Sequence, residues 1–218
     1  QGRWADRLLR RLHYKMLNRF NACWIVDEAA NGGLSGDLAH PPVTPPRAAY
    51  IGILFQFSDF IFDPKQVVAN RVLVLLSGPE PMRTQLEQLV LEQAAGLTQY
   101  EFIIVAGNPL GAVPAVLPEQ VTYYTHLASK ELAPLLASAA LVVSRSGYST
   151  IMDLAVLGKR ALLIPTPGQT EQEYLALYLQ KKKYYSSTLQ NELHLAVDIP
   201  KALTAALLPL KPSDYPNR

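Results

Sequence analysis

Five short apolar segments between residues 71 and 164 constrain the fold of this 218-residue chain more than any other feature. Segments whose apolar residues recur at helical spacing separate them, and the first of these contains Leu86, Val90 and Ala94. Strands that are apolar at every position are buried on both faces, so this alternation predicts a parallel sheet with helices on both sides. The expected strands are 71–76, 101–107, 121–125, 141–144 and 160–164, and further helices are expected at 131–139, 150–157 and 172–181.

This pattern predicts an α/β fold with a doubly wound, Rossmann-like parallel sheet. Folds of this class bind ligands outside the carboxyl ends of the strands, near the point where the strand order reverses. The loops that follow the strands are therefore the places to search for a site. They are 77–83, 125–130, 144–150 and 165–172.

The first 48 residues have a different organisation. Apolar residues recur every fourth position from Trp4 to Phe20, which predicts an amphipathic helix, and residues 22–26 form one short apolar run. The proline-rich stretch 41–46 is expected to be a loop. One helix and one strand cannot bury a core, so residues 1–48 are expected to be the end of a truncated domain. Residues 49–69 are then a linker and residues 70–218 the main domain.

Composition excludes several classes of function. Hydrophobic residues make up 49% of the chain and charged residues 17%, which is typical of a folded domain. The net charge of +2 is not concentrated on the main domain, so no nucleic-acid partner is expected. The single cysteine, Cys23, excludes a cysteine metal cluster, and the histidines lack metal-ligand spacing, so no metal site is predicted. No secretory signal or uncharged run of about 20 residues is present.

The segment 144–153 contains the strongest candidate site. Gly147 is interpreted as permitting a tight turn out of the fourth strand, which places Ser149 and Thr150 at a helix N-terminus that favours a phosphate. Asp153, one turn further on, could accept hydrogen bonds from ribose hydroxyls. An alternative needs no ligand, because Thr150 and Asp153 also have the spacing of a capping box.

This segment resembles glycosyltransferase family 28 over roughly residues 70–183. The resemblance depends on Arg145-Ser146-Gly147-x-x-Thr150-x-x-Asp153, followed by 158–160 and 163–165. It implies the GT-B fold, in which two Rossmann-like domains enclose the active site. Residues 1–48 would then be the end of an N-terminal acceptor-side domain, and residues 70–218 would be the C-terminal nucleotide-sugar-binding domain.

The resemblance also implies roles for individual residues. Gly147, Ser149 and Thr150 match the phosphate-contacting turn, and Arg145 and Ser146 match its lead-in. Two further residues complete the expected nucleotide site: Asp153 stands where the family usually has a ribose-binding glutamate, and Leu127 lies where backbone groups contact the uracil edge.

Two further loops are expected to face the donor. Residues 170–176 resemble the family's Asp-His-Gln-x-x-Asn-Ala segment, which contacts the donor sugar. Here Gln172 and Ala176 match, whereas Thr170, Glu171 and Leu175 depart from the pattern, so the identity of the sugar stays open. The spacing of Thr170 and Glu173 also fits a capping box.

The loop that begins at Ser77 and Gly78 departs more from the family. Pro79 and Pro81 remove two backbone donors, and Glu80 adds a carboxylate, so a cradle of N–H groups for phosphate is not expected. Ser77, Gly78 and Glu80 are therefore predicted only to line the cleft. Arg83 could compensate for the missing donors, but a solvated surface arginine is the favoured interpretation.

The implied function is inverting, metal-independent transfer of an N-acetylhexosamine or hexose from a UDP-sugar to an acceptor. No cofactor is implied besides the UDP-sugar substrate, and the acceptor is a lipid-linked compound or a saccharide. The family's catalytic base belongs to the N-terminal domain, so the fragment is expected to be inactive alone. A UDP-sugar 2-epimerase, a non-catalytic donor-binding subunit of a split enzyme, and a domain without nucleotide-sugar function remain alternatives.

The N-terminal helix bears on localisation. We expect a cytoplasmic protein that contacts the inner membrane face peripherally if the basic helix with Trp4 and Phe20 binds anionic lipid. The alternative, which the periodicity favours, is that the helix packs on the sheet of its own domain. Apolar surface left by a missing partner domain would promote self-association.

Overall fold

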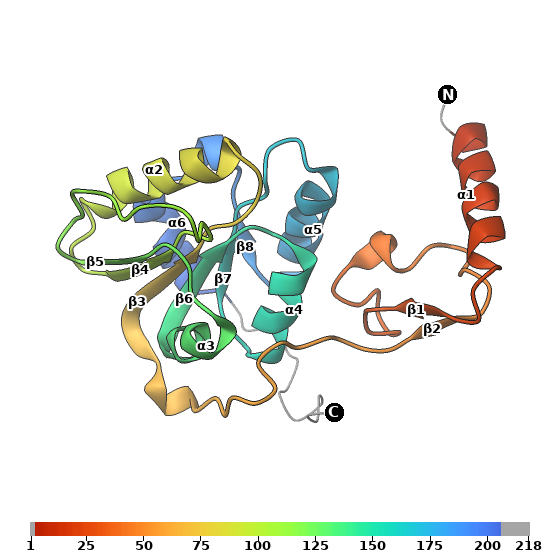
Figure 1. Cartoon of the computed structure of the whole chain (residues 1–218), viewed down its shortest axis with the longest axis horizontal. Coiled ribbons are helices and arrows are strands. Elements are labelled where there is room, and N and C mark those ends of the chain that lie inside the picture. Colours follow the sequence, from red (N-terminus) through yellow and green to blue (C-terminus); the bar gives the residue numbers. More distant parts are fainter. Residues whose placement is uncertain (1–2, 206–218) are drawn as a thin grey trace. The chain divides into compact units, whose positions relative to one another are not determined.

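The structure, a computed structural model, describes residues 3–205 (Figure 1). The chain divides into two compact units, residues 1–54 and 55–218, which are treated separately. The first unit contains α1 (Arg3–Leu17), β1 (Cys23–Ile25), a 3₁₀ turn at Gly36–Leu38 and β2 (Ala48–Tyr50). β1 and β2 pair in parallel, with Cys23 opposite Ala48 and Ile25 opposite Tyr50. The predicted helix and first strand are present, and β2 is an additional strand.

Asp27 organises the loop between these two strands. Its side chain is fully buried and accepts hydrogen bonds from the N–H groups of Leu34 and Ser35 at 2.8 and 3.1 Å, and from Ser35 Oγ at 2.5 Å. His40 Nε2 lies 3.2 Å from the same carboxylate. Burial alone would raise the pKa of Asp27, but the hydrogen bonds from Ser35 and from the N–H groups of Leu34 and Glu28 hold it below its usual value. A buried carboxylate with several hydrogen bonds thus holds this short loop together.

The second unit is built on one six-stranded parallel sheet, which confirms the predicted α/β class. The sheet order is β5-β4-β3-β6-β7-β8, and every neighbouring pair is parallel. The predicted strands correspond to β3 to β7, and β8 is additional. The strands are β3 (Val68–Leu75), β4 (Glu101–Val105), β5 (Val121–Tyr124), β6 (Ala139–Ser144), β7 (Ala161–Leu163) and β8 (Ser186–Ser187).

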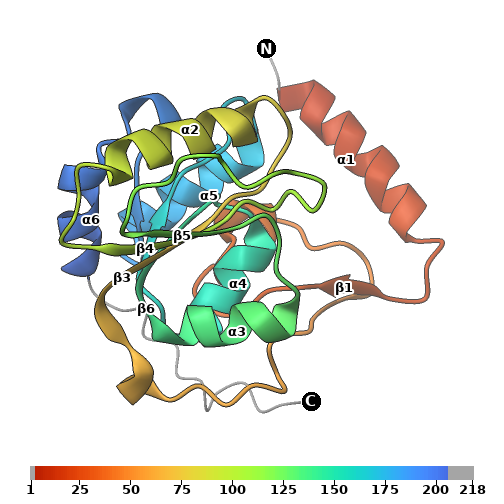
Figure 2. The ribbon, with the colours of Figure 1, turned by 60° about the vertical axis from the view of Figure 1, so that its left-hand side comes forward.

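Helices cover both faces of this sheet, as Figures 1 and 2 show together. α2 (Met82–Ala94) and α6 (Leu195–Leu203) lie on one face, and α3 (Ser129–Ser138) and α4 (Tyr148–Val156) lie on the other. α5 (Thr170–Lys181) precedes β8 and contacts it. Alternate residues of β3 face opposite layers, so Val72 and Val74 join the core that α2 and α6 cover.

The segment after α5 was not predicted in detail. β8 consists of two serines, and α6 contains Pro200, so neither has a simple periodic pattern. α6 nevertheless buries Leu195, Ile199 and Ala202 against β6 and β7. Tertiary packing therefore stabilises a helix that local propensity disfavours. Among residues 3–205, no helix combines the length and apolar character needed to cross a bilayer.

Candidate functional site

The topological switch point of the sheet lies between β3 and β6. From β3 the chain continues outward to β4 and β5, and it then returns to β6 and continues to β7 and β8 on the other side. The loops after β3 and β6 therefore leave the sheet side by side in opposite directions, which creates a crevice at the carboxyl ends of the strands.

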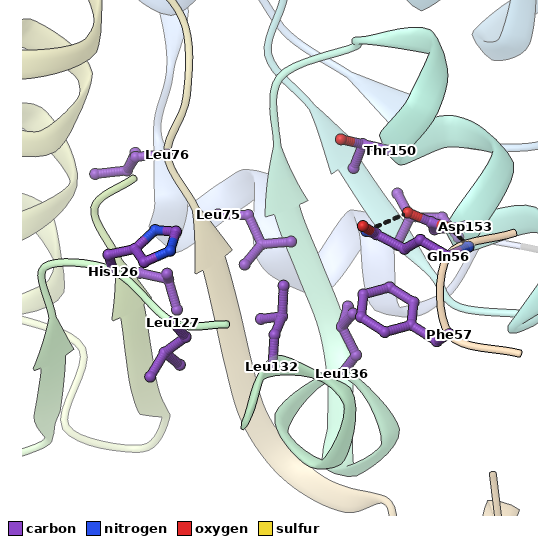
Figure 3. Close-up of a pocket in the computed structure, with 12 residues that line it drawn as sticks. Gln56, Phe57, Leu75, Leu76, His126, Leu127, Leu132, Leu136, Thr150 and Asp153 are labelled. Carbon is purple, nitrogen blue, oxygen red and sulfur yellow. Dashed lines mark hydrogen bonds between the residues drawn. The ribbon is translucent and has the colours of Figure 1, made fainter. Parts of the chain in front are cut away.

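A pocket of about 190 Å³ lies at this edge, on the face that α3 and α4 cover (Figure 3). The ends of β3 and β4 and the side of α3 contribute apolar side chains. The lining also includes four polar residues from three parts of the unit: Gln56, His126, Thr150 and Asp153. Apolar walls with a few convergent polar groups are the usual composition of a small-molecule site. The structure thus brings Leu127, Thr150 and Asp153, three of the predicted site residues, into one pocket.

Asp153 is the only buried carboxylate of this pocket. Its side chain is 6% exposed, and Gln56 donates to both carboxylate oxygens, from the backbone N to Oδ1 at 3.2 Å and from Nε2 to Oδ2 at 2.7 Å. Burial raises the pKa of Asp153 to about 6, and the two hydrogen bonds from Gln56 oppose this rise. A carboxylate in this setting is a strong acceptor for hydroxyl groups when ionised.

The capping-box interpretation of Thr150 and Asp153 is wrong. α4 begins at Tyr148 with Gly147 as its N-cap, and no side chain caps it. Thr150 therefore lies in the first turn, and Asp153 lies beyond it and bonds to Gln56 instead. The backbone N–H groups of the first turn, which includes Ser149 and Thr150, have no acceptor inside the helix, because the first intrahelical bond runs from Ile151 N to Gly147 O at 3.0 Å.

The interpretation of Gly147 as a residue that permits a tight turn is also wrong. Its φ of −71° and ψ of 138° are accessible to any residue, so the backbone does not require glycine there. A Cβ built on Gly147 would meet no atom within 4 Å beyond its chain neighbours. The glycine therefore leaves open space beside the uncapped helix N-terminus, which suits close approach of a ligand.

Arg145 and Ser146 support the site from inside the protein. Arg145 is 2% exposed, and its guanidinium donates to Met82 O at 2.8 Å, Gln190 Oε1 at 2.7 Å and the carbonyls of Ile164 and Pro165 at 3.3 and 3.2 Å. Burial lowers the pKa of Arg145 to about 10. Ser146 is buried and donates from Oγ to Gln172 O at 2.8 Å. Both side chains thus hold the loops after β3, β6 and β7 together.

The first turn of α5 is exposed at Thr170 and Glu171 and half-buried at Gln172. Gln172 Oε1 accepts from Thr166 N at 2.9 Å, and its Nε2 donates to Gln169 Oε1 at 2.6 Å. α5 has Gln169 as its N-cap and no side-chain cap, so the capping box expected from Thr170 and Glu173 does not form. The geometry fixes the Gln172 amide within its own loop.

The loop after β3 is exposed at Ser77, Gly78 and Glu80. Arg83, expected to be solvated, is instead only 7% exposed. Its Nε donates to Glu80 Oε1 at 2.7 Å, and its Nη1 donates to Glu87 Oε2 at 2.6 Å. Because two carboxylates neutralise this guanidinium, Arg83 supplies no unpaired positive charge to the crevice.

Sequence reasoning missed Gln56 and Phe57, which line the pocket. Both lie in the stretch interpreted as a linker, and Gln56 is 97 residues from Asp153. His126 also lines the pocket, and its position directly after the expected strand 121–125 is the signal that could have found it.

Comparison with known proteins identifies the class of this domain. The fold matches the glycotransferase of kitacinnamycin with a TM-score of 0.61, at 15% identity over 78% of this chain and 44% of that one. The calicheamicin glycosyltransferase CalG4 matches with a TM-score of 0.56, at 16% identity over 75% and 40% of the two chains. These likenesses define the fold as that of a GT-B glycosyltransferase domain.

The sequence identifies the family. The profile of the glycosyltransferase family 28 C-terminal domain matches residues 81–214, which is more than half of the chain, so the chain belongs to this family. A UDP-N-acetylglucosamine--N-acetylmuramyl-(pentapeptide) pyrophosphoryl-undecaprenol N-acetylglucosamine transferase of Methylobacterium sp. (strain 4-46) is 36% identical over 98 residues, 45% of this chain and 23% of that protein. The Gloeobacter violaceus enzyme of the same name is 33% identical over 103 residues, 46% of this chain and 29% of that protein. The chain therefore matches less than a third of these relatives' length.

Proposed function

We propose that this chain is the donor-binding part of a glycosyltransferase that moves a sugar from UDP to an acceptor hydroxyl. The observation that carries the proposal is the pairing of a buried carboxylate, Asp153, with the uncapped N-terminus of its own helix, α4, at the switch point of the sheet. A nucleoside diphosphate has the matching chemistry, because its ribose diol donates hydrogen bonds and its phosphates accept them.

The nucleoside end of the donor fits the pocket. The ribose hydroxyls would donate to the Asp153 carboxylate, which retains acceptor capacity beyond the two bonds from Gln56. The base would lie against the apolar walls near Leu127, where the loop after β5 borders the pocket. His126 also lines this side and is a further candidate contact.

The diphosphate fits the first turn of α4. The N–H groups near Ser149 and Thr150 and the positive helix end favour an anion there, and Gly147 leaves the space for its approach. These donors would also stabilise the charge that develops on the departing UDP, so the transfer needs no metal. The acceptor oxygen would attack the anomeric carbon from the opposite side, which inverts its configuration.

The relatives' names support a proposal for the sugar and the acceptor. Their donor is UDP-N-acetylglucosamine and their acceptor is a pyrophosphoryl-undecaprenol lipid, so we propose an N-acetylhexosamine donor first and a lipid-linked acceptor. The loop with Thr170, Glu171 and Gln172 would face the donor sugar. Residues that activate the acceptor would come from another part of the enzyme, as in the family.

Calorimetric titration of the 218-residue chain tests this function. The ligands are UDP, UDP-N-acetylglucosamine, UDP-glucose and thymidine diphosphate glucose, and the variant is Asp153→Asn, which keeps shape and removes charge. Loss of hydrogen bonds to a charged acceptor should weaken binding about 10- to 100-fold. The control is Asp59→Asn, because Asp59 is exposed and accepts only a 3.4 Å bond from Ser58 among residues 3–205.

Saturable binding of one UDP ligand, retained by Asp59→Asn and lost by Asp153→Asn, would support the proposal. Failure of the folded wild-type chain to bind any of the four ligands would refute it.

A further inference from the structure

Gln56 alone donates two hydrogen bonds to the carboxylate of Asp153 in the candidate site. It lies at the start of the second unit, in a stretch without helix or strand, 97 residues before Asp153. Its backbone N reaches one carboxylate oxygen at 3.2 Å, and its side-chain Nε2 reaches the other at 2.7 Å (Figure 3). Two contacts at opposite ends of the carboxylate fix both its rotation and its position.

This grip leaves the carboxylate able to bind a ligand. An ionised carboxylate has about four acceptor positions, and Gln56 occupies two of them. Both side chains line the same pocket, so a diol that enters it would bind the remaining positions while Gln56 stays in place. The hydrogen bonds from Gln56 therefore leave the carboxylate with acceptor capacity for a ligand.

We propose that Gln56 is a positioning residue for the nucleotide, which holds the Asp153 carboxylate oriented and ionised for the ribose hydroxyls. This inference rests on the proposed function and adds a residue that local sequence motifs do not reveal.

The charged groups near the pocket make Gln56 important for the ionisation of the Asp153 carboxyl. Apart from Asp153 itself, the titratable residue lining the pocket is His126, from the loop after β5. The lining residues from α3, β3 and β4 are all apolar, and the segment at 56–57 contributes only Gln56 and Phe57. Lys159, the nearest cation along the chain, donates to the carbonyls of Ala137 and Ala139, and Arg145 is bound to carbonyl groups and Gln190. The Gln56 bonds thus oppose the rise in pKa that burial causes.

Gln56→Met tests the inference, because methionine keeps the length of the side chain and removes its N–H donors. The matched control is Gln88→Met, since Gln88 is an exposed residue of α2. UDP affinity is measured by calorimetry on the full chain from pH 5.5 to 8, and the Asp153 carboxyl is titrated by ¹³C NMR, with its signal assigned through Asp153→Asn.

Gln56→Met should weaken UDP binding about 3- to 10-fold at pH 7, because one bond to the carboxylate is lost. Wild-type affinity should fall as pH drops through about 6, where the carboxyl of Asp153 takes up its proton. In Gln56→Met the same fall, and the pKa of the free protein, should move to higher pH. Gln88→Met should match the wild type in both measurements.

Three results would overturn the inference, and they separate it from the proposed function. Equal affinity and an equal pH profile in Gln56→Met and Gln88→Met would remove the role of Gln56 and leave donor binding intact. A uniform loss of affinity without any pH shift would reduce Gln56 to a structural residue. Failure of the wild-type chain to bind UDP would refute donor binding itself and the role of Gln56 with it.

Discussion

The buried carboxyl of Asp153 predicts an unusual dependence of stability on pH. Burial raises its pKa from 3.8 to about 6, so the folded protein holds this proton more tightly than the unfolded chain does. Between these two values the folded state binds more protons, and the free energy of unfolding therefore decreases as pH rises. The contribution of Asp153 is complete below pH 3.8 and is lost once pH passes about 6.

The magnitude follows from the same values. The difference of 6 − 3.8 = 2.2 pKa units, at about 1.36 kcal/mol per unit, corresponds to about 3 kcal/mol over the whole range. Integration between pH 4.5 and 7.5 leaves about 2 kcal/mol. Asp153→Asn removes this titration, so the stability of the variant relative to the wild type should rise by about 2 kcal/mol over that interval.

Urea unfolding measured by far-UV circular dichroism at pH 4.5 and 7.5 checks this value. Circular dichroism suits the measurement because both tryptophans, Trp4 and Trp24, lie in the first unit, so their fluorescence would not report on the sheet of the second. The difference between variant and wild type cancels other groups that titrate in the same interval, and Asp59→Asn should follow the wild type. Equal pH dependence in the wild type and Asp153→Asn would refute the reasoning.

Three further substitutions distinguish residues that stabilise the fold from residues that bind the ligand. Gly147→Ala should weaken UDP binding at least about 10-fold in calorimetry, because the new methyl group enters the space assigned to the phosphates. Its circular dichroism spectrum should match that of the wild type. Unchanged UDP affinity would contradict the assignment of the phosphates to this space. Arg145→Met should lower the free energy of unfolding in urea by about 3 to 5 kcal/mol, because it leaves buried acceptors at Met82, Ile164, Pro165 and Gln190 without their donor. A decrease below about 1 kcal/mol would argue against this structural role of Arg145. Gly107→Ala should lower the free energy of unfolding by at least about 2 kcal/mol, because Gly107 has a φ of +64° and the new Cβ would overlap Leu76 O. A melting temperature equal to that of the wild type would be inconsistent with this strain.

The sheet was predictable from sequence because its central strands are buried on both faces. The apolar runs that became β3, β4 and β6 have that character at nearly every position, and each lies within a few residues of its predicted range. β8 lacked such a signal, since Ser186 and Ser187 are half-buried at the edge of the sheet. β2 has the sequence Ala-Ala-Tyr, which lacks the β-branched residues that favour strands.

The site was predictable only where the residues are local to one motif. Thr150 and Asp153 share a helix face, and the position of Leu127 follows from the end of a strand, so the switch-point rule was sufficient to place them at one edge. Gln56 reaches Asp153 through tertiary packing, which no local pattern encodes. The direction of the Arg145 side chain was equally inaccessible, because the same position can face the ligand or the core. The ligand roles of these residues stay predictions.

The residues of the motif at 145–153 are of two kinds: those that the protein's own structure requires and those that it does not. Arg145 and Ser146 are accounted for by hydrogen bonds that hold neighbouring loops together. Gly147 is not, because neither its backbone angles nor any neighbouring atom excludes a side chain. Asp153 is bonded to Gln56, yet its burial raises its pKa to about 6, which works against stability at neutral pH. Gly147 and Asp153 lie at the first turns of one helix beside the switch point, and this position is the reason for our proposal that they serve a ligand.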